Sequence, residues 1–195
     1  LYFAENFDSA FPALSVNVKM DREMAIYESE KLSKKYNWTP TEYSKAVSFD
    51  GDRNLQTFVE LEGGGLDTFK MLYSDNIFYP YVWRVRHFQE KNPNEVSVWF
   101  TPKGKPYSFS QKLSEDEPGS AISRKDAYDI AMGSLKDDWY VNLDQYELVD
   151  ESEKVQPGGR VDHTFTYQLS GFQLGENGFI KLKLTVLGDR LGELV

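Results

Sequence analysis

The sequence contains no cysteine, only two histidines and no long apolar run. The lack of cysteine excludes disulfide bonds, thiol catalysis and cysteine-ligated zinc. No stretch approaches the roughly 20 apolar residues that a membrane-spanning helix needs. No complete signal peptide is visible either. These absences leave few kinds of chemistry that the chain can perform by itself.

Basic residues are also scarce. The chain has 22 lysines and arginines but 31 aspartates and glutamates, which gives a formal net charge of −9. Nucleic-acid binding needs a basic stripe that displaces counterions from phosphate, so a broad nucleic-acid-binding face is excluded. Residues 1–114 carry 14 basic and 15 acidic side chains, whereas residues 115–195 carry 8 and 16. The second part of the chain therefore holds nearly all the excess negative charge, which favours solubility and attracts basic partners.

What the chain does have is 40% hydrophobic and 15% aromatic residues, enough for a sizeable core. It also repeats short patterns in a fixed order. Arg84–Phe88 (RVRHF) returns as Arg160–Phe165 (RVDHTF), and Met20–Ala25 is mirrored by Ile122–Ala127. Small units gain core by packing on one another. The repeats predict an α+β fold of two tandem related units, each a helix packed on an antiparallel β-sheet.

The predicted boundaries are an N-terminal segment at 1–19, a first unit at 20–113 with an insertion at 63–80, a linker at 114–120 and a second unit at 121–195. The linker is polar and contains Pro118 and Gly119, as segments between domains often do. The chain starts without Met and stops after strand-like sequence. We therefore expect a piece of a longer protein, in which residues 1–19 follow a membrane span.

Two helices are expected to begin at good capping residues, Asp21 and Ser123, and to end before Trp38 and Trp139. After each helix the apolar period falls to two residues, which indicates strands. The predicted strands are Ala46–Phe49, Leu55–Leu61, Tyr81–Gln89 and Glu95–Thr101, followed by Gln145–Asp150, His163–Leu169 and Phe179–Leu187.

The two histidines, His87 and His163, raise the possibility of a metal or general-base site. Strand parity favours another interpretation, because each histidine alternates with apolar residues on one face of its strand. We expect both imidazoles to point into the core. The alternative is a hydrolase or metal enzyme that uses His87 and His163 together with Glu60 and Glu62.

Two charged doublets also draw attention, Glu60 with Glu62 and Arg84 with Arg86. The carboxylates would suit acid–base chemistry if they lay beside a substrate. The simpler expectation is that the doublets face each other on adjacent strands as ion pairs. If they are not neighbours, the arginines become a candidate carboxylate or phosphate site.

The aromatic run from Phe78 to Trp83, which includes Tyr81, is a candidate peptide-binding surface together with Phe11, Tyr107 and Phe109. Aromatic residues are also enriched in central strands, so the run fits a core strand as well. An extended peptide can moreover be captured by the edge of a sheet. The binding residues that we propose from the sequence are Glu60, Glu62, Tyr81, Trp83, Arg84 and Arg86.

The segments Leu55–Gly64, Tyr81–Phe88, Gly158–Phe165 and Leu187–Leu191 resemble the soluble accessory region of CPBP-type (CAAX-like, abortive-infection) intramembrane metalloproteases of bacteria. In that family, catalysis belongs to a membrane-embedded core with a Glu-Glu-x-x-x-Arg motif, which this chain lacks. The resemblance implies a domain tethered to the membrane and displayed on its extracytoplasmic side. The helix-then-strand pattern is also similar to PepSY repeats.

We therefore expect a non-catalytic regulatory module that binds a peptide or protein, including the membrane core of its own chain. The module is expected to bind no cofactor, no metal and no nucleic acid. Besides the enzyme described above, a structural spacer or oligomerisation domain remains an alternative.

Overall fold

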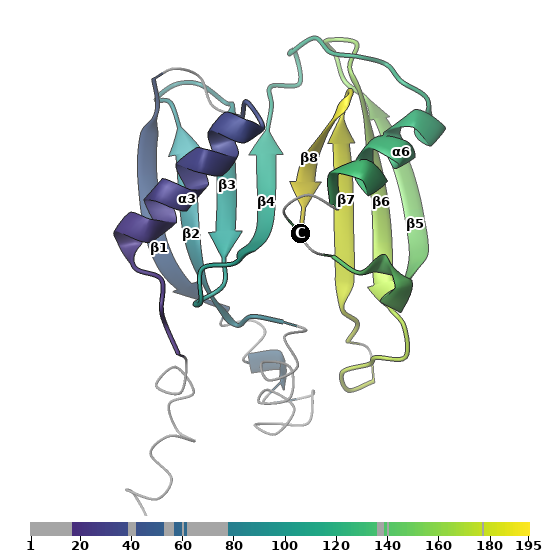
Figure 1. The fold of residues 1–195 in the computed structure, drawn as a ribbon. Coiled ribbons are helices and arrows are strands. Elements are labelled where there is room, and N and C mark those ends of the chain that lie inside the picture. Colours follow the sequence, from purple (N-terminus) through teal and green to yellow (C-terminus); the bar gives the residue numbers. More distant parts are fainter. Residues whose placement is uncertain are drawn as a thin grey trace, which may run out of the picture.

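The computed structural model describes residues 17–38, 42–52, 57–59, 61, 78–135, 139, 141–176 and 178–195. In this part of the chain, eight strands form one antiparallel sheet in the order β1-β2-β3-β4-β8-β7-β6-β5, and the helices α3 and α6 pack on it (Figure 1). The α+β class is thus confirmed, as one continuous sheet. The elements are α3 (Arg22–Lys35), β1 (Ser44–Gly51), β2 (Tyr81–Phe88), β3 (Glu95–Phe100), β4 (Pro106–Lys112), α6 (Arg124–Leu135), the 3-10 turn η2 (Leu143–Gln145), β5 (Tyr146–Val155), β6 (Val161–Leu169), β7 (Lys181–Leu187) and β8 (Arg190–Leu194).

Both helices begin at the predicted capping residues. Asp21 accepts a hydrogen bond from the backbone N–H of Met24 at 2.8 Å, and Ser123 accepts one from that of Asp126 at 3.2 Å. Each helix turns small residues toward the sheet, and the alanines Ala25, Ala127 and Ala131 are fully buried. Small side chains let a helix lie close to the strands. α3 covers β1 and β2, and α6 covers β6, β7 and β8.

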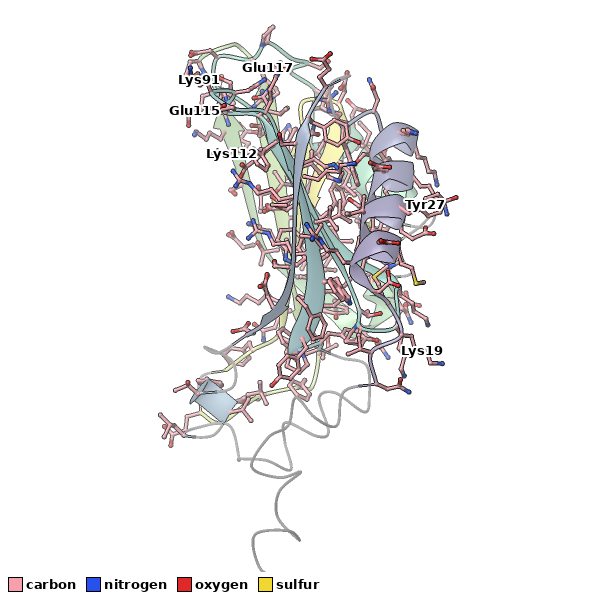
Figure 2. All side chains as sticks on the ribbon, turned by 90° about the vertical axis from the view of Figure 1, so that its left-hand side faces the viewer. Lys19, Tyr27, Lys91, Lys112, Glu115 and Glu117 are labelled. Atoms are coloured by element: carbon pink, nitrogen blue, oxygen red, sulfur yellow. The ribbon has the colours of Figure 1, made fainter. Side chains whose placement is uncertain are left out.

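The other face of the sheet has no helix among the described residues. Figure 2 views the sheet along its plane, with α3 and Tyr27 on one side and Lys112 on the other. Residues that share a face with Lys112 by register include Arg86, Glu95 and Ser97. We call this the open face, and it is mostly polar.

Six of the seven predicted strands are present, but the prediction of a strand at Leu55–Leu61 is wrong for residues 57–59, which are helical. Val59 in this turn is fully buried against Leu174, in a small apolar cluster outside the main core. The remaining positions of that segment, except Leu61, lie outside the described residues. The alternating pattern does not describe burial here either, because Leu61, which shares strand parity with the buried Val59, is 78% exposed.

β4 and β8 were not predicted, and these two strands join the halves of the sheet. They pair through only two positions, Phe109 with Leu194 and Ser110 with Glu193. We call this pairing the seam. On the helix side, the Phe109 ring stacks on Trp38 at 4.5 Å and on Trp139 at 4.7 Å between ring centroids, and the two tryptophans are 6.4 Å apart. One apolar cluster consequently runs across both halves.

The open face reinforces the seam with hydrogen bonds. The Glu193 carboxylate accepts from Ser110 on β4 at 3.3 Å and from Thr185 on β7 at 2.9 Å. It also pairs with Lys183 at 2.9 Å. One side chain of β8 is thereby bonded to both neighbouring strands, which compensates for the short backbone pairing.

A buried ion pair fixes the segment that connects β4 to α6. Arg160 is 3% exposed and donates from Nε to Asp162 at 2.8 Å. Its Nη1 donates to the backbone oxygens of Ser114 and Glu117 at 3.2 and 3.1 Å. A Cβ on Gly119 would lie 2.7 Å from the Arg160 side chain, so this segment needs glycine there. The predicted linker at 114–120 is therefore packed, while the division into domains stays a prediction.

Replacing Arg160 with Met should cost about 3–5 kcal/mol of unfolding free energy, because Asp162 would keep a buried charge without its partner. The matched control is Arg124→Met, which removes an exposed pair with Glu151 and should cost less than about 1 kcal/mol. Urea unfolding measures both losses. Equal losses for the two variants would show that the buried Arg160–Asp162 pair contributes no more to stability than an exposed pair.

Candidate functional site

A groove of about 890 Å³ opens at the end of the sheet where β4 and β7 begin. Its size lies within the range of ligand-binding pockets. Its walls come from the start of β4, the start of β7, the end of β8 and the segment after α6. The lining residues are Phe78, Tyr79, Thr101, Lys105, Pro106, Tyr107, Ser108, Trp139, Val141, Asn142, Gln145, Tyr146, Phe179, Ile180, Lys181, Leu182, Leu194 and Val195.

The groove lies next to the seam. β4 begins at Pro106, but the first of its residues that pairs with β8 is Phe109, opposite Leu194. β7 begins at Lys181, whereas Leu194 of β8 lies opposite Leu184. The first residues of β4 and β7 therefore extend past β8, and the space between them is open.

The side chains that line the groove are mainly aromatic and aliphatic, and the charged ones among them are all basic. Six of its residues are aromatic, two are lysines (Lys105 and Lys181), and none is an aspartate or glutamate. This composition stands out in a chain whose formal net charge is −9. The groove thus offers apolar surface beside positive charge, which suits a ligand with apolar groups and a carboxylate.

Two tyrosine hydroxyls in the groove stay protonated over the physiological pH range. Burial raises the pKa of Tyr107 to about 12, against an opposing hydrogen bond to the backbone of Tyr79. The rings of Tyr79 and Tyr107 also meet edge to face at 5.2 Å. Burial likewise raises the pKa of Tyr146. Both hydroxyls can donate hydrogen bonds, and neither can act as a base near neutral pH.

The aromatic run that the sequence singled out is divided between the groove and the core. Phe78 and Tyr79 line the groove, together with Tyr107. Tyr81 and Trp83 do not line it, because both pack on Phe49, at 6.3 and 5.1 Å between ring centroids. Phe109 is buried in the seam, and Phe11 lies outside the described residues.

Arg84 and Arg86 lie on the open face, away from the groove lining. Among the described residues, the strands that neighbour β2 are β1 and β3, so the expected pairing of these arginines with Glu60 and Glu62 stays a prediction. Arg86 forms an ion pair with Glu95. Arg84 stacks on Trp99 at 5.3 Å and donates to Ser97 at 3.2 Å, beside a shallow hollow of about 290 Å³. Glu60 and Glu62 lie outside the described residues.

Both histidines point into the core, as strand parity predicted. His87 is 1% exposed, with its Nε2 2.5 Å from Ser29 Oγ on α3. His163 is 2% exposed, with its Nε2 3.0 Å from the backbone oxygen of Ile122. β2 and β6 are five strand positions apart, roughly 24 Å at about 4.8 Å a strand. The two imidazoles therefore cannot share an ion.

Among the described residues, no three side chains of His, Cys, Asp or Glu gather as a metal site would require. The same part of the chain contains no helix long and apolar enough to cross a membrane. Comparison with models of protein families, with curated proteins and with solved structures found no match.

Several groove residues were not identified from the sequence. Lys105, Tyr146, Phe179 and Lys181 were assigned no role, and Trp139 served only to end a helix. These residues lie far apart in the chain, and only the pairing of β4 with β8 brings them together. The sequence did point to Phe78, Tyr79 and Tyr107, which belong to the predicted aromatic binding surface and line the groove.

The burial of His87 lowers its pKa from the ordinary 6.5 to about 4. Its imidazole should therefore stay neutral down to about pH 5. Because the folded pKa lies below the unfolded one, the contribution of His87 to stability is complete above pH 6.5 and is lost as the pH falls toward 4. NMR titration of the imidazole Cε1–H resonance measures this, and His87→Gln assigns the signal. A midpoint near 6.5 would contradict the burial.

Proposed function

We propose that this domain is a non-catalytic module that binds an extended peptide or protein segment in the groove between β4 and β7. The observation that carries the proposal is the lining, with aromatic and aliphatic side chains around two lysines and no aspartate or glutamate. The chain as a whole has a formal net charge of −9, so two lysines without an acidic neighbour in the lining give this groove a local positive charge that favours a ligand carboxylate.

The separation of the histidines also supports a binding role. A two-histidine metal enzyme would need His87 and His163 side by side, and they lie under different helices. The titratable groups that line the groove are tyrosines and lysines. Such groups suit recognition better than acid–base catalysis near neutral pH, since their usual pKa values lie near 10.

We further propose that the module belongs to a membrane-embedded protease of the CPBP type and lies on the extracytoplasmic side. This part of the proposal rests on the sequence segments that resemble the accessory region of that family. A binding groove is consistent with a module that recruits substrates or contacts the membrane core of its own chain.

We also infer that the chain arose from two tandem related units. Each helix is followed by four strands, and β4 meets β8 in antiparallel pairing, as two copies related by a two-fold axis would. His87 on β2 and His163 on β6 each bond to the helix side of their own half. Trp38 and Trp139, which follow the two helices, both stack on Phe109.

Selection of random displayed dodecapeptides on residues 1–195 tests the binding role. We expect recovered peptides to combine apolar residues with a carboxylate. Lys181→Glu should weaken their binding about tenfold, roughly 1.4 kcal/mol, because it places a negative charge in the groove. The matched control is Lys125→Glu on the exposed side of α6, which should leave binding unchanged.

Two results would overturn the binding role. One is a selection that yields no peptide sensitive to Lys181→Glu. The other is self-association in sedimentation that Lys181→Glu abolishes, because the groove would then belong to a second copy of the chain.

A further inference from the structure

We propose that the open face carries a second binding site, in the hollow beside Arg84, for an oxyanion group of a ligand such as a phosphate or a carboxylate. Three side chains that line the hollow carry this inference, Arg84, Ser97 and Lys112. The site is separate from the groove and does not depend on the proposed function. Its volume of about 290 Å³ lies just below the roughly 300–1,000 Å³ of small-molecule pockets, so it suits one group of a ligand.

Strand register explains why the open face is hollowed here. Ser97 on β3 and Ser110 on β4 lie opposite each other, and both side chains are short. Longer side chains surround them, with Arg84 on β2, Trp99 on β3 and Lys112 on β4. The two serines therefore form a low floor between taller walls.

Arg84 and Lys112 approach Ser97 from opposite sides. The direct partner of Ser97 on β2 is Arg86, two residues from Arg84, and its direct partner on β4 is Ser110, two residues from Lys112. Both cations are thus diagonal neighbours of Ser97, roughly 7–8 Å away, a distance that long side chains can span. Arg84 does span it, since its Nη2 donates to Ser97 Oγ at 3.2 Å.

The hollow has a positive charge that its own acids do not cancel. Glu95 and Glu193 line it, but each forms an ion pair with a cation outside the lining. Among the described residues, neither Arg84 nor Lys112 forms an ion pair. Two cations therefore remain available to an anion, in a chain whose formal net charge is −9.

The donors around Ser97 suit an anion that carries several oxygens. A guanidinium has five N–H donors, and Arg84 uses one of them for Ser97, while its stack on Trp99 holds the plane in place. Because Ser97 accepts that bond, its own hydroxyl hydrogen can point to a ligand oxygen. Lys112 adds an ammonium with three donors. Charge-assisted hydrogen bonds of this kind bind phosphates and carboxylates.

NMR titration with inorganic phosphate tests the site, with chloride holding the ionic strength constant. We expect saturable shifts of the Ser97 and Lys112 amides and of the Arg84 side-chain N–H. Arg84→Gln and Lys112→Gln should each weaken binding about tenfold, because each removes a charged donor. The matched control is Lys125→Gln on the exposed side of α6, which removes the same charge and should leave binding unchanged. Lys112 is exposed, so its variant tests the site without disturbing the packing of the sheet.

A parallel titration with acetate distinguishes the two kinds of ligand group. Acetate that binds as tightly as phosphate would support a carboxylate ligand, and tighter binding of phosphate would support a phosphate ligand. The site is overturned if neither anion gives saturable shifts, or if Lys125→Gln weakens binding as much as Arg84→Gln and Lys112→Gln do. Lys181→Glu in the groove should not change phosphate binding, so this site and the peptide groove can fail independently.

Discussion

The fold depends on a seam of two residue pairs between β4 and β8. So short a backbone pairing needs side chains to support it. Phe109 stacks on both Trp38 and Trp139 on the helix side, and Glu193 is bonded to β4 and β7 on the open face. At the far end of the sheet, the buried Arg160 holds the connecting segment by two backbone oxygens. The two halves are thus joined by contacts that lie almost entirely outside the strand ladder.

The groove lies next to the seam. Its walls include the first residues of β4 and β7. Their backbone groups and the aromatic residues around them face open space. Trp139 is part of both the seam and the groove, because it stacks on Phe109 in the seam and lines the groove. Occupation of the groove is therefore physically linked to the contacts that hold the halves together.

Much of the fold is predictable from the sequence, because its helices have good caps and the six strands that were predicted alternate between apolar and polar residues. The two strands of the seam are not, since β4 is rich in serine and starts at Pro106, and β8 has only five residues and includes Gly192. Burial of His87 and His163 follows from strand parity. The groove could not be predicted, because Lys105, Trp139 and Lys181 come together only after β4 and β8 pair. The two-residue alternation along the strand likewise predicts that Arg84 and Arg86 share one face, but it does not predict which side chains lie beside them.

Native-state hydrogen exchange over a denaturant series tests most directly whether the seam makes one cooperative unit. If it does, the slowest amides of β2 and β3 and those of β6 and β7 should converge on a single free energy of opening and a single dependence on denaturant. Two separate limits, one for the strands that carry His87 and one for those that carry His163, would contradict the account. The halves would then open independently, and the groove between them would not be a fixed part of the fold.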